Sequence, residues 1–130
     1  MLLLDENMPA SQQRWLRERR IRFRVIGVDI GSLGIKDENL IPILHRLPQP
    51  TFFSLDQDFC EPRLRHASYG LAWLDVADNR AAEFLRRFLR HPMFNTQAKR
   101  MGMVARVHAG GVRFWKLKDR CAQTVSWHDA

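Results

Sequence analysis

The chain has 130 residues, of which 45% are hydrophobic and 27% are charged, the composition of one soluble globular domain with its own core. No apolar run approaches the roughly 20 residues that a membrane-spanning helix needs, which excludes a membrane as a partner. The formal net charge of +7 favours a polyanionic partner such as nucleic acid. A start without a basic leader argues against a signal peptide, and two distant cysteines, Cys60 and Cys121, indicate free thiols in the cytoplasm.

Short apolar runs alternate with helical patterns in the first half of the chain. The runs that predict strands are Leu2–Leu4, Phe23–Val28 and Thr51–Leu55. Pro9 suits the first position of a helix that runs to about Arg20. A second helix is expected to begin near Asn39, because proline is disfavoured in a helix interior and this start leaves Pro42 in the first turn.

The second half continues with a strand, a helix and a hairpin. The predicted strands are Tyr69–Val76, Met101–His108 and Val112–Leu117, the last two flanking the turn signal Ala109-Gly110-Gly111. Asp78 or Asn79 is expected to cap a helix that ends before Pro92. The pattern predicts an α/β fold in one domain over 1–130: a core over 1–92 with a mainly parallel, twisted sheet, and a C-terminal antiparallel hairpin and tail over 93–130.

Acidic residues follow two of the predicted strands. Asp5 comes directly after Leu2–Leu4, and Asp56 and Asp58 come after the run that begins at Thr51. The carboxyl ends of parallel strands form the crevice where ligands bind, so these carboxylates are expected to share a pocket in which a divalent cation relieves their repulsion. If the strand continues, Asp56 and Asp58 face the same way. Acids at strand ends are also common as helix caps, and this alternative stays open for each of them.

Three motifs carry a resemblance to a known family: LLLDENMP at the start, GIKDENLI in the middle and SLDQDF after the third strand. In this order they resemble the compact PIN-like proteins of the DUF5615 type, relatives of the VapC-like toxin ribonucleases. The resemblance implies a small three-layer fold and a metal-dependent nuclease. The catalytic and metal-binding residues that it implies are Asp5, Asp37, Asp56 and Asp58, with Glu38 as a neighbouring candidate and Ser54 as a small hydroxyl residue before the third acid. Three features depart from the family pattern: Cys60, where the family commonly has glycine, Pro42 in the helix after Asp37, and the high arginine content.

Phosphodiester hydrolysis needs an activated water, neutralised phosphoryl charge and a stabilised leaving oxygen, and one or two Mg²⁺ or Mn²⁺ ions supply all three. These ions prefer carboxylate oxygens and keep several waters. In this interpretation Asp5 and Asp56 bind metal directly, while Asp58 and Asp37 are ligands or hold the attacking water. The basic residues nearest to the pocket in sequence, which could hold phosphates, are Lys36, Arg63 and Arg65.

Other site chemistries find no support in the sequence. The five histidines lack the spacing of a zinc site, and no serine-hydrolase elbow is present. Cys60 stands beside the acidic residues, whose negative charge is expected to disfavour its thiolate. Of the four tryptophans, Trp115 on the predicted hairpin is the best candidate for stacking on bases.

Two functions follow from these observations. The first is a metal-dependent endonuclease, in particular a ribonuclease acting as the toxin of a toxin–antitoxin pair. Its partners would be RNA and a small antitoxin protein, and a homodimer is compatible with it. The alternative is a non-catalytic PIN-like module that would use its basic faces to hold nucleic acid and the hairpin or C-terminal tail to hold a protein. Salt-sensitive binding that is indifferent to chelators would distinguish the second from the first.

Overall fold

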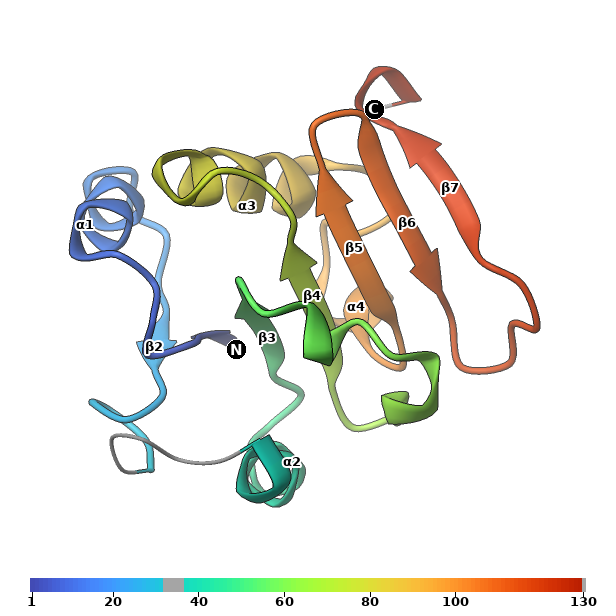
Figure 1. Cartoon of the computed structure of the whole chain (residues 1–130), viewed down its shortest axis with the longest axis horizontal. Coiled ribbons are helices and arrows are strands. Elements are labelled where there is room, and N and C mark those ends of the chain that lie inside the picture. Colours follow the sequence, from blue (N-terminus) through green and yellow to red (C-terminus); the bar gives the residue numbers. More distant parts are fainter. Residues whose placement is uncertain (32–36, 130) are drawn as a thin grey trace.

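A seven-stranded sheet forms the centre of the protein (Figure 1). The computed structural model describes residues 1–31 and 37–129, with the backbone alone described at 37, 38 and 129. The strands are β1 (Leu2–Leu4), β2 (Arg24–Val25), β3 (Thr51–Ser54), β4 (Gly70–Leu74), β5 (Val104–His108), β6 (Gly111–Trp115) and β7 (Gln123–Ser126). In the order β2–β1–β3–β4–β5–β6–β7, neighbours are parallel up to β5 and antiparallel beyond it. This confirms the predicted α/β class and mainly parallel sheet, which β7 extends beyond the hairpin.

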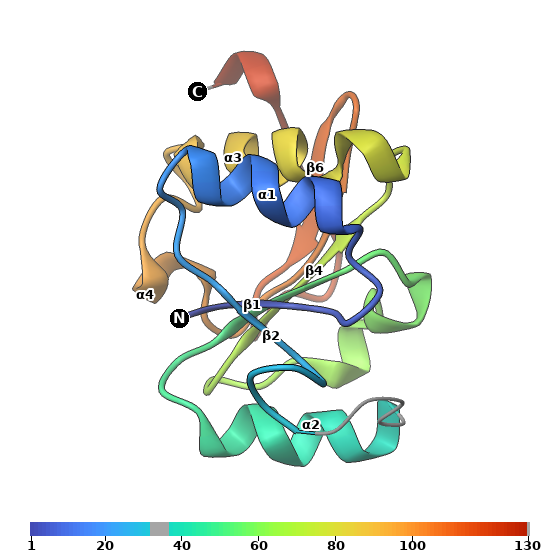
Figure 2. The same cartoon turned by 90° about the vertical axis from the view of Figure 1, so that its left-hand side faces the viewer.

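Helices cover both faces of the sheet. They are α1 (Ala10–Glu18), α2 (Asp37–Arg46), α3 (Ala81–Arg90) and α4 (Gln97–Arg100). α1 and α3 lie over one face and α2 lies over the other, which gives three layers (Figure 2). Because successive strand residues point to opposite faces, Phe53 of β3 packs with Phe88 of α3, whereas Phe52 enters the core that contains Leu44 of α2. β3 is therefore buried on both faces, as its apolar run predicted.

The second strand is shorter than the sequence predicts. It covers Arg24–Val25 rather than Phe23–Val28. Gly27 turns the chain with a φ of 88°, a conformation that favours glycine, and the Asp29 carboxylate accepts a backbone N–H of β2 at 2.9 Å. The turn ends the pairing early and leaves Val28 74% exposed.

Helix α2 begins earlier than the sequence predicts. Its first residue is Asp37 rather than Asn39, so Pro42 lies in the helix interior instead of the first turn. Proline lacks the N–H that would bond four residues back. Burial of Leu40 and Leu44 against the sheet offsets that loss, because packing of an apolar face contributes most of the stability of a helix in a protein.

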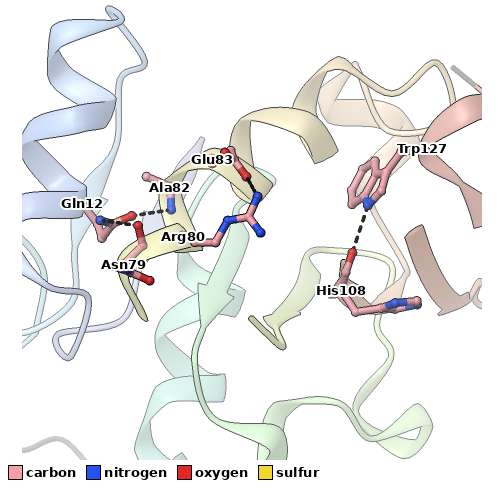
Figure 3. A network of polar contacts seen from close by, with 7 residues as sticks. All are labelled: Gln12, Asn79, Arg80, Ala82, Glu83, His108 and Trp127. Atoms are coloured by element: carbon pink, nitrogen blue, oxygen red, sulfur yellow. Dashed lines mark hydrogen bonds and ion pairs between the residues drawn. The ribbon is translucent and has the colours of Figure 1, made fainter. Parts of the chain in front are cut away.

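The N-terminus of α3 is capped from another helix (Figure 3). The predicted cap by Asp78 or Asn79 is wrong, because these residues form a 3-10 turn before the helix. Gln12 of α1, which is buried, accepts the N–H of Ala82 through Oε1 at 2.9 Å and donates through Nε2 to the carbonyl of Asn79 at 3.1 Å. A single amide therefore joins α1 to α3.

The fourth helix, α4, is not predicted by the sequence analysis. Thr96 accepts the N–H of Lys99 at 3.3 Å and so caps the start of this helix. Arg100 at its end is buried, and donates to the Thr51 hydroxyl at 3.0 Å and to the carbonyl of Phe94 at 2.8 Å. Of the helices that the structure describes, none has the length and apolar character to cross a lipid bilayer.

The C-terminal hairpin closes at the predicted glycine-rich turn. His108 pairs with Gly111, which leaves Ala109 and Gly110 as a two-residue connection. Gly111 has a φ of 147°, and a Cβ there would lie 2.1 Å from the carbonyl oxygen of Val125 in β7. Glycine is therefore required at this position by both conformation and space.

Candidate functional site

The carboxyl ends of β1 and β3 lie side by side in the parallel sheet. Leu4 pairs with Phe53, and the N–H of Asp5 donates to the carbonyl of Phe53 at 3.0 Å. This register places Asp5 beside Ser54, the last residue of β3. The hydroxyl of Ser54, which is fully buried, donates to Asp5 Oδ2 at 2.9 Å. A carboxylate and a hydroxyl from distant parts of the sequence are thus joined where two strands end.

Ser54 also joins this pair to the next acid. Its hydroxyl oxygen accepts the N–H of Asp56 at 2.9 Å. Asp56 Oδ1 in turn accepts the N–H of Asp58 at 2.9 Å and caps the 3-10 turn Gln57–Phe59. β3 ends at Ser54, before both acids, so Asp56 and Asp58 do not lie on one face of a continuing strand. Asp56 therefore caps a helical turn through Oδ1, which is the alternative that the sequence left open for these acids. Its Oδ2 makes no hydrogen bond within the described residues.

These acids are not neutralised by arginines. Asp5 is half-buried, whereas Asp56 and Asp58 are exposed. Within residues 1–31 and 37–129, no ion pair involves any of the three. Negative charge at these strand ends is therefore available to a cation from solvent.

Asp75 is a further strand-end acid that the sequence analysis misses. It follows β4 at once, as Asp5 follows β1, and its N–H donates to the carbonyl of Val107 at 2.8 Å. The Asp75 carboxylate accepts a hydrogen bond from Nε of Arg106 in β5 at 2.8 Å. The signal for Asp75 was the same apolar run ending in an acid, but an arginine on the neighbouring strand already supplies its counter-charge.

For four of the predicted site residues, the structure describes no side-chain hydrogen bond or ion pair with Asp5, Ser54 or Asp56. Lys36 falls outside the described residues, as do the side chains of Asp37 and Glu38. Arg63 is exposed in the 3-10 turn Pro62–Leu64. Their predicted roles therefore remain predictions.

Arg65, the last predicted phosphate ligand, is held by backbone carbonyls. Its Nε donates to Pro62 at 2.8 Å, and its Nη1 donates to Lys116 at 2.6 Å and to Asp119 at 2.7 Å. Two of its three nitrogens are thus used to tie the turn after β3 to the loop after β6. This arrangement gives Arg65 a structural role that its sequence position did not suggest.

The donors at this site suit a hard divalent ion. Mg²⁺ usually takes one or two protein carboxylates and completes its shell with water and substrate phosphate, and Asp5 and Asp56 are linked through one hydroxyl. Among the described residues, no group of three His, Cys, Asp or Glu side chains is placed to hold a metal ion. A cation bound here would take its other ligands from water or from substrate.

Cys60 follows the 3-10 turn, and its surroundings disfavour the thiolate. Desolvation by burial raises the pKa of its thiol above the usual value, the charge of Arg106 lowers it in part, and Glu61 raises it. The predicted disfavoured thiolate is confirmed, but burial rather than negative charge is its main cause.

Comparison with known proteins does not assign this site. No protein-family model, no curated protein and no solved structure matches the chain. The candidate site therefore rests on how the chain itself places Asp5, Ser54 and Asp56.

Proposed function

We propose that the protein is a Mg²⁺- or Mn²⁺-dependent nuclease that hydrolyses phosphodiester bonds in RNA. The observation that carries the proposal is the link from Asp5 Oδ2 through the Ser54 hydroxyl to the N–H of Asp56, with 2.9 Å for each hydrogen bond. It fixes two acidic residues at neighbouring strand ends, where parallel sheets bind ligands. The net charge of +7 supports a polyanionic substrate.

Each residue has a distinct role in this proposal. Asp5 gives one oxygen to Ser54 and would bind the ion through Oδ1, which has a single long contact of 3.5 Å with the N–H of Asn7. Asp56 would bind through Oδ2, because Oδ1 caps the next turn. Asp37 and Asp58 would complete the ligands or hold the attacking water. When bound, the ion would activate a water and neutralise phosphoryl charge.

The resemblance of three sequence motifs to PIN-like ribonucleases supports RNA as the substrate. It extends the proposal to a toxin that acts in the cytoplasm and is held inactive by a small antitoxin protein. A homodimer is compatible with this role.

Replacing one proposed ligand tests the proposal. Asp5→Asn keeps the shape of the side chain and loses the charge that binds metal, so RNA cleavage is expected to fall by about a hundredfold or more. The measurement is the initial rate of cleavage of a fluorescently labelled single-stranded RNA with Mg²⁺ or Mn²⁺. Wild-type cleavage is expected to stop in EDTA and to return when excess Mn²⁺ is added.

Asp78→Asn is the matched control, because Asp78 is an exposed acid in the turn before α3. This variant should cleave at the wild-type rate. Absence of cleavage by the wild-type protein with either metal, or equal rates for wild type and Asp5→Asn, would refute the nuclease.

A non-catalytic module that binds nucleic acid is the second candidate function. It is favoured by the use of Asp56 Oδ1 as a cap, which needs no metal to explain this acid. It predicts no cleavage, steeply salt-dependent RNA binding, and the same affinity for wild type and Asp5→Asn with or without EDTA.

A further inference from the structure

A basic hollow lies at the opposite, amino-terminal ends of β1 and β2. Its volume of about 670 Å³ is within the range of ligand-binding pockets. Four arginines of one short segment line it together with the apolar Ile21 and Phe23: Arg17, Arg20, Arg22 and Arg24. Figure 2 shows this segment descending from the end of α1 to β2, beside the start of β1. No acid among the described residues lines this basic hollow.

The four arginines are exposed and receive no counter-charge within the part of the chain that the structure describes. The guanidinium of Arg17 lies 5.1 Å from the centre of the Phe23 ring and reaches Gln13 Oε1 at 3.5 Å. The side chains of the other three make no hydrogen bond to described residues. Like charges left unpaired on neighbouring residues repel one another, and together they create a strong positive potential over the hollow.

Arg20 has a backbone conformation that favours glycine. Its φ is 60°, and its N–H donates to the carbonyl of Arg17 at 2.9 Å just beyond the end of α1. Glycine is the usual residue at this position, because a Cβ is strained in the left-handed region. Arginine therefore costs stability here while placing a charge on the wall of the hollow, and such an outlier points to a use for the side chain.

A buried arginine adds positive charge at the same end of the sheet. Arg100 is 7% exposed, and its two hydrogen-bond acceptors, the Thr51 hydroxyl and the Phe94 carbonyl, are both neutral. Thr51 pairs with Leu2, so this guanidinium lies at the amino end of β3, next to the start of β1. A charge that has little contact with water is poorly screened and strengthens the field around it.

We propose that the basic hollow binds the phosphate backbone of single-stranded RNA. Four guanidinium groups along one exposed segment suit a row of phosphates better than one compact anion, and the ring of Phe23 offers apolar surface to a base or ribose. The inference rests on the proposed function for one point, that the bound strand is the substrate.

The distance across β1 is compatible with one RNA strand reaching both ends of the sheet. β1 has 3 residues, so about 10 Å separate the hollow from Asp5 at about 3.3 Å per residue. A single RNA strand of a few nucleotides is long enough to cross that distance. A strand held in the hollow can therefore present a phosphodiester to the acids.

The test measures RNA binding without catalysis. Fluorescence anisotropy of a labelled single-stranded RNA of about 12 nucleotides is recorded in EDTA for wild type and Arg20→Gly. We expect the variant to bind about two- to fivefold more weakly and the slope of log K against log salt to fall by about 0.7. Its melting temperature should rise by up to about 4 °C, because glycine relieves the backbone strain. Weaker binding combined with higher stability is not the result expected of an arginine with a structural role.

Two variants separate the charge from the backbone. Arg14→Gln removes the same charge from the exposed surface of α1 outside the hollow, and should leave the salt slope unchanged. Gln49→Gly relieves a similar backbone conformation, with a φ of 46°, and removes no charge, so it should leave affinity unchanged. It also loses the exposed hydrogen bond that Gln49 accepts from Gln97 at 3.1 Å, so affinity rather than stability is the quantity compared.

Three results would overturn the proposal. The first two are equal losses of RNA affinity in Arg14→Gln and Arg20→Gly, and no loss of RNA affinity in Arg20→Gly. The third is that AMP or poly-glutamate displaces the labelled RNA as strongly as unlabelled RNA does at equal charge. Failure of the nuclease is distinguishable. RNA bound through the hollow but never cleaved with Mn²⁺ would refute the nuclease and keep this site. Cleavage at the wild-type rate by Arg20→Gly would keep the nuclease and refute this binding site.

Discussion

The two ends of the parallel strands differ in how their charged side chains are held. At the carboxyl ends, Asp5 is hydrogen-bonded to Ser54, Asp56 caps a turn and Asp75 is paired with Arg106. At the amino ends, exposed arginines surround the basic hollow of about 670 Å³, and no described acid pairs with them. Hydrogen bonds fix the acidic end, whereas the exposed arginines of the basic end make few contacts with the rest of the protein.

This difference matches two physical tasks. Metal chemistry needs carboxylates held in place, so each ligand requires its own hydrogen-bonded support. Phosphate binding through counterion release depends on the number of charges more than on their direction, and tolerates mobile side chains. Substitutions at the acidic end should therefore change metal affinity and stability, while substitutions at the basic end should change salt dependence.

The largest effect beyond the metal ligands is expected from Ser54→Ala. The hydroxyl holds Asp5 Oδ2 and accepts the N–H of Asp56, so its removal frees one carboxylate and leaves one donor without its acceptor. We expect the affinity for Mn²⁺ to fall by about 10- to 100-fold and the free energy of unfolding to fall by about 1–3 kcal/mol. Metal titration of cleavage and urea unfolding measure the two effects.

Ser68→Ala is the control for this change, because the Ser68 hydroxyl makes no hydrogen bond to described residues; it should alter neither quantity. Ser54 is a positioning residue, so its effect on metal affinity must pass through the two acids that its hydroxyl holds, Asp5 and Asp56. In the double variant with Asp5→Asn, the losses of Mn²⁺ affinity should therefore be less than additive. Additive losses would contradict this role for Ser54.

A smaller effect, on stability alone, is expected from Gln12→Leu. Gln12 serves the N–H of Ala82 and the carbonyl of Asn79 from a buried position, so leucine leaves both groups without their partner. The free energy of unfolding should fall by about 1–3 kcal/mol, seen as a lower urea midpoint with an unchanged slope. If the acidic end is fixed by such long-range hydrogen bonds, cleavage should also become more sensitive to urea.

Gln13→Leu provides the comparison on the same helix. Gln13 is half-buried and donates to the carbonyl of Met8, five residues away, at 3.0 Å. Loss of this local bond, together with the long 3.5 Å contact that Gln13 accepts from Arg17, should cost less than about 1 kcal/mol. Equal losses in the two glutamine variants would mean that the link between α1 and α3 adds nothing beyond an ordinary hydrogen bond.

Most of the fold was predictable because its signals are local. The apolar run that became β3 is buried on both faces, the apolar spacing in α3 faces the core, and the glycines at 110 and 111 mark the turn between β5 and β6. The cap of α3 was not predictable, since Gln12 lies 70 residues from Ala82. Nor was the start of α2, where burial of Leu40 and Leu44 outweighs the preference against Pro42.

The candidate site was predictable in outline because parallel strands end at one edge of a sheet. That rule brings Asp5 to Ser54 across 49 residues. It cannot say which oxygen of Asp56 caps a turn, since that depends on where β3 ends. The pairing of Asp75 depends on Arg106 of a neighbouring strand, and the role of Arg65 depends on a loop 51 residues away.

The smallest effect is expected from Arg106→Met, which leaves Asp75 without its counter-charge. Both side chains are partly exposed, at 40% and 35%, so the free energy of unfolding should fall by less than about 1 kcal/mol. The thiol of Cys60 gives a more sensitive measurement, because the charge of Arg106 lowers its pKa against the larger effect of burial. Without that charge the pKa of Cys60 should rise further, and alkylation by iodoacetamide near neutral pH should slow, since the thiolate is the reactive form.

Cys121 is exposed and serves as an internal control, with an alkylation rate that should not change. If the rate at Cys60 also stays constant in Arg106→Met, then Arg106 acts on Asp75 alone, and the charges at the acidic end work as separate pairs. A slower rate at Cys60 with an unchanged rate at Cys121 would mean that Arg106 influences the region beyond its own partner. In that case the two ends of the sheet differ in the combined field of their charged groups, and not only in the pairing of single residues.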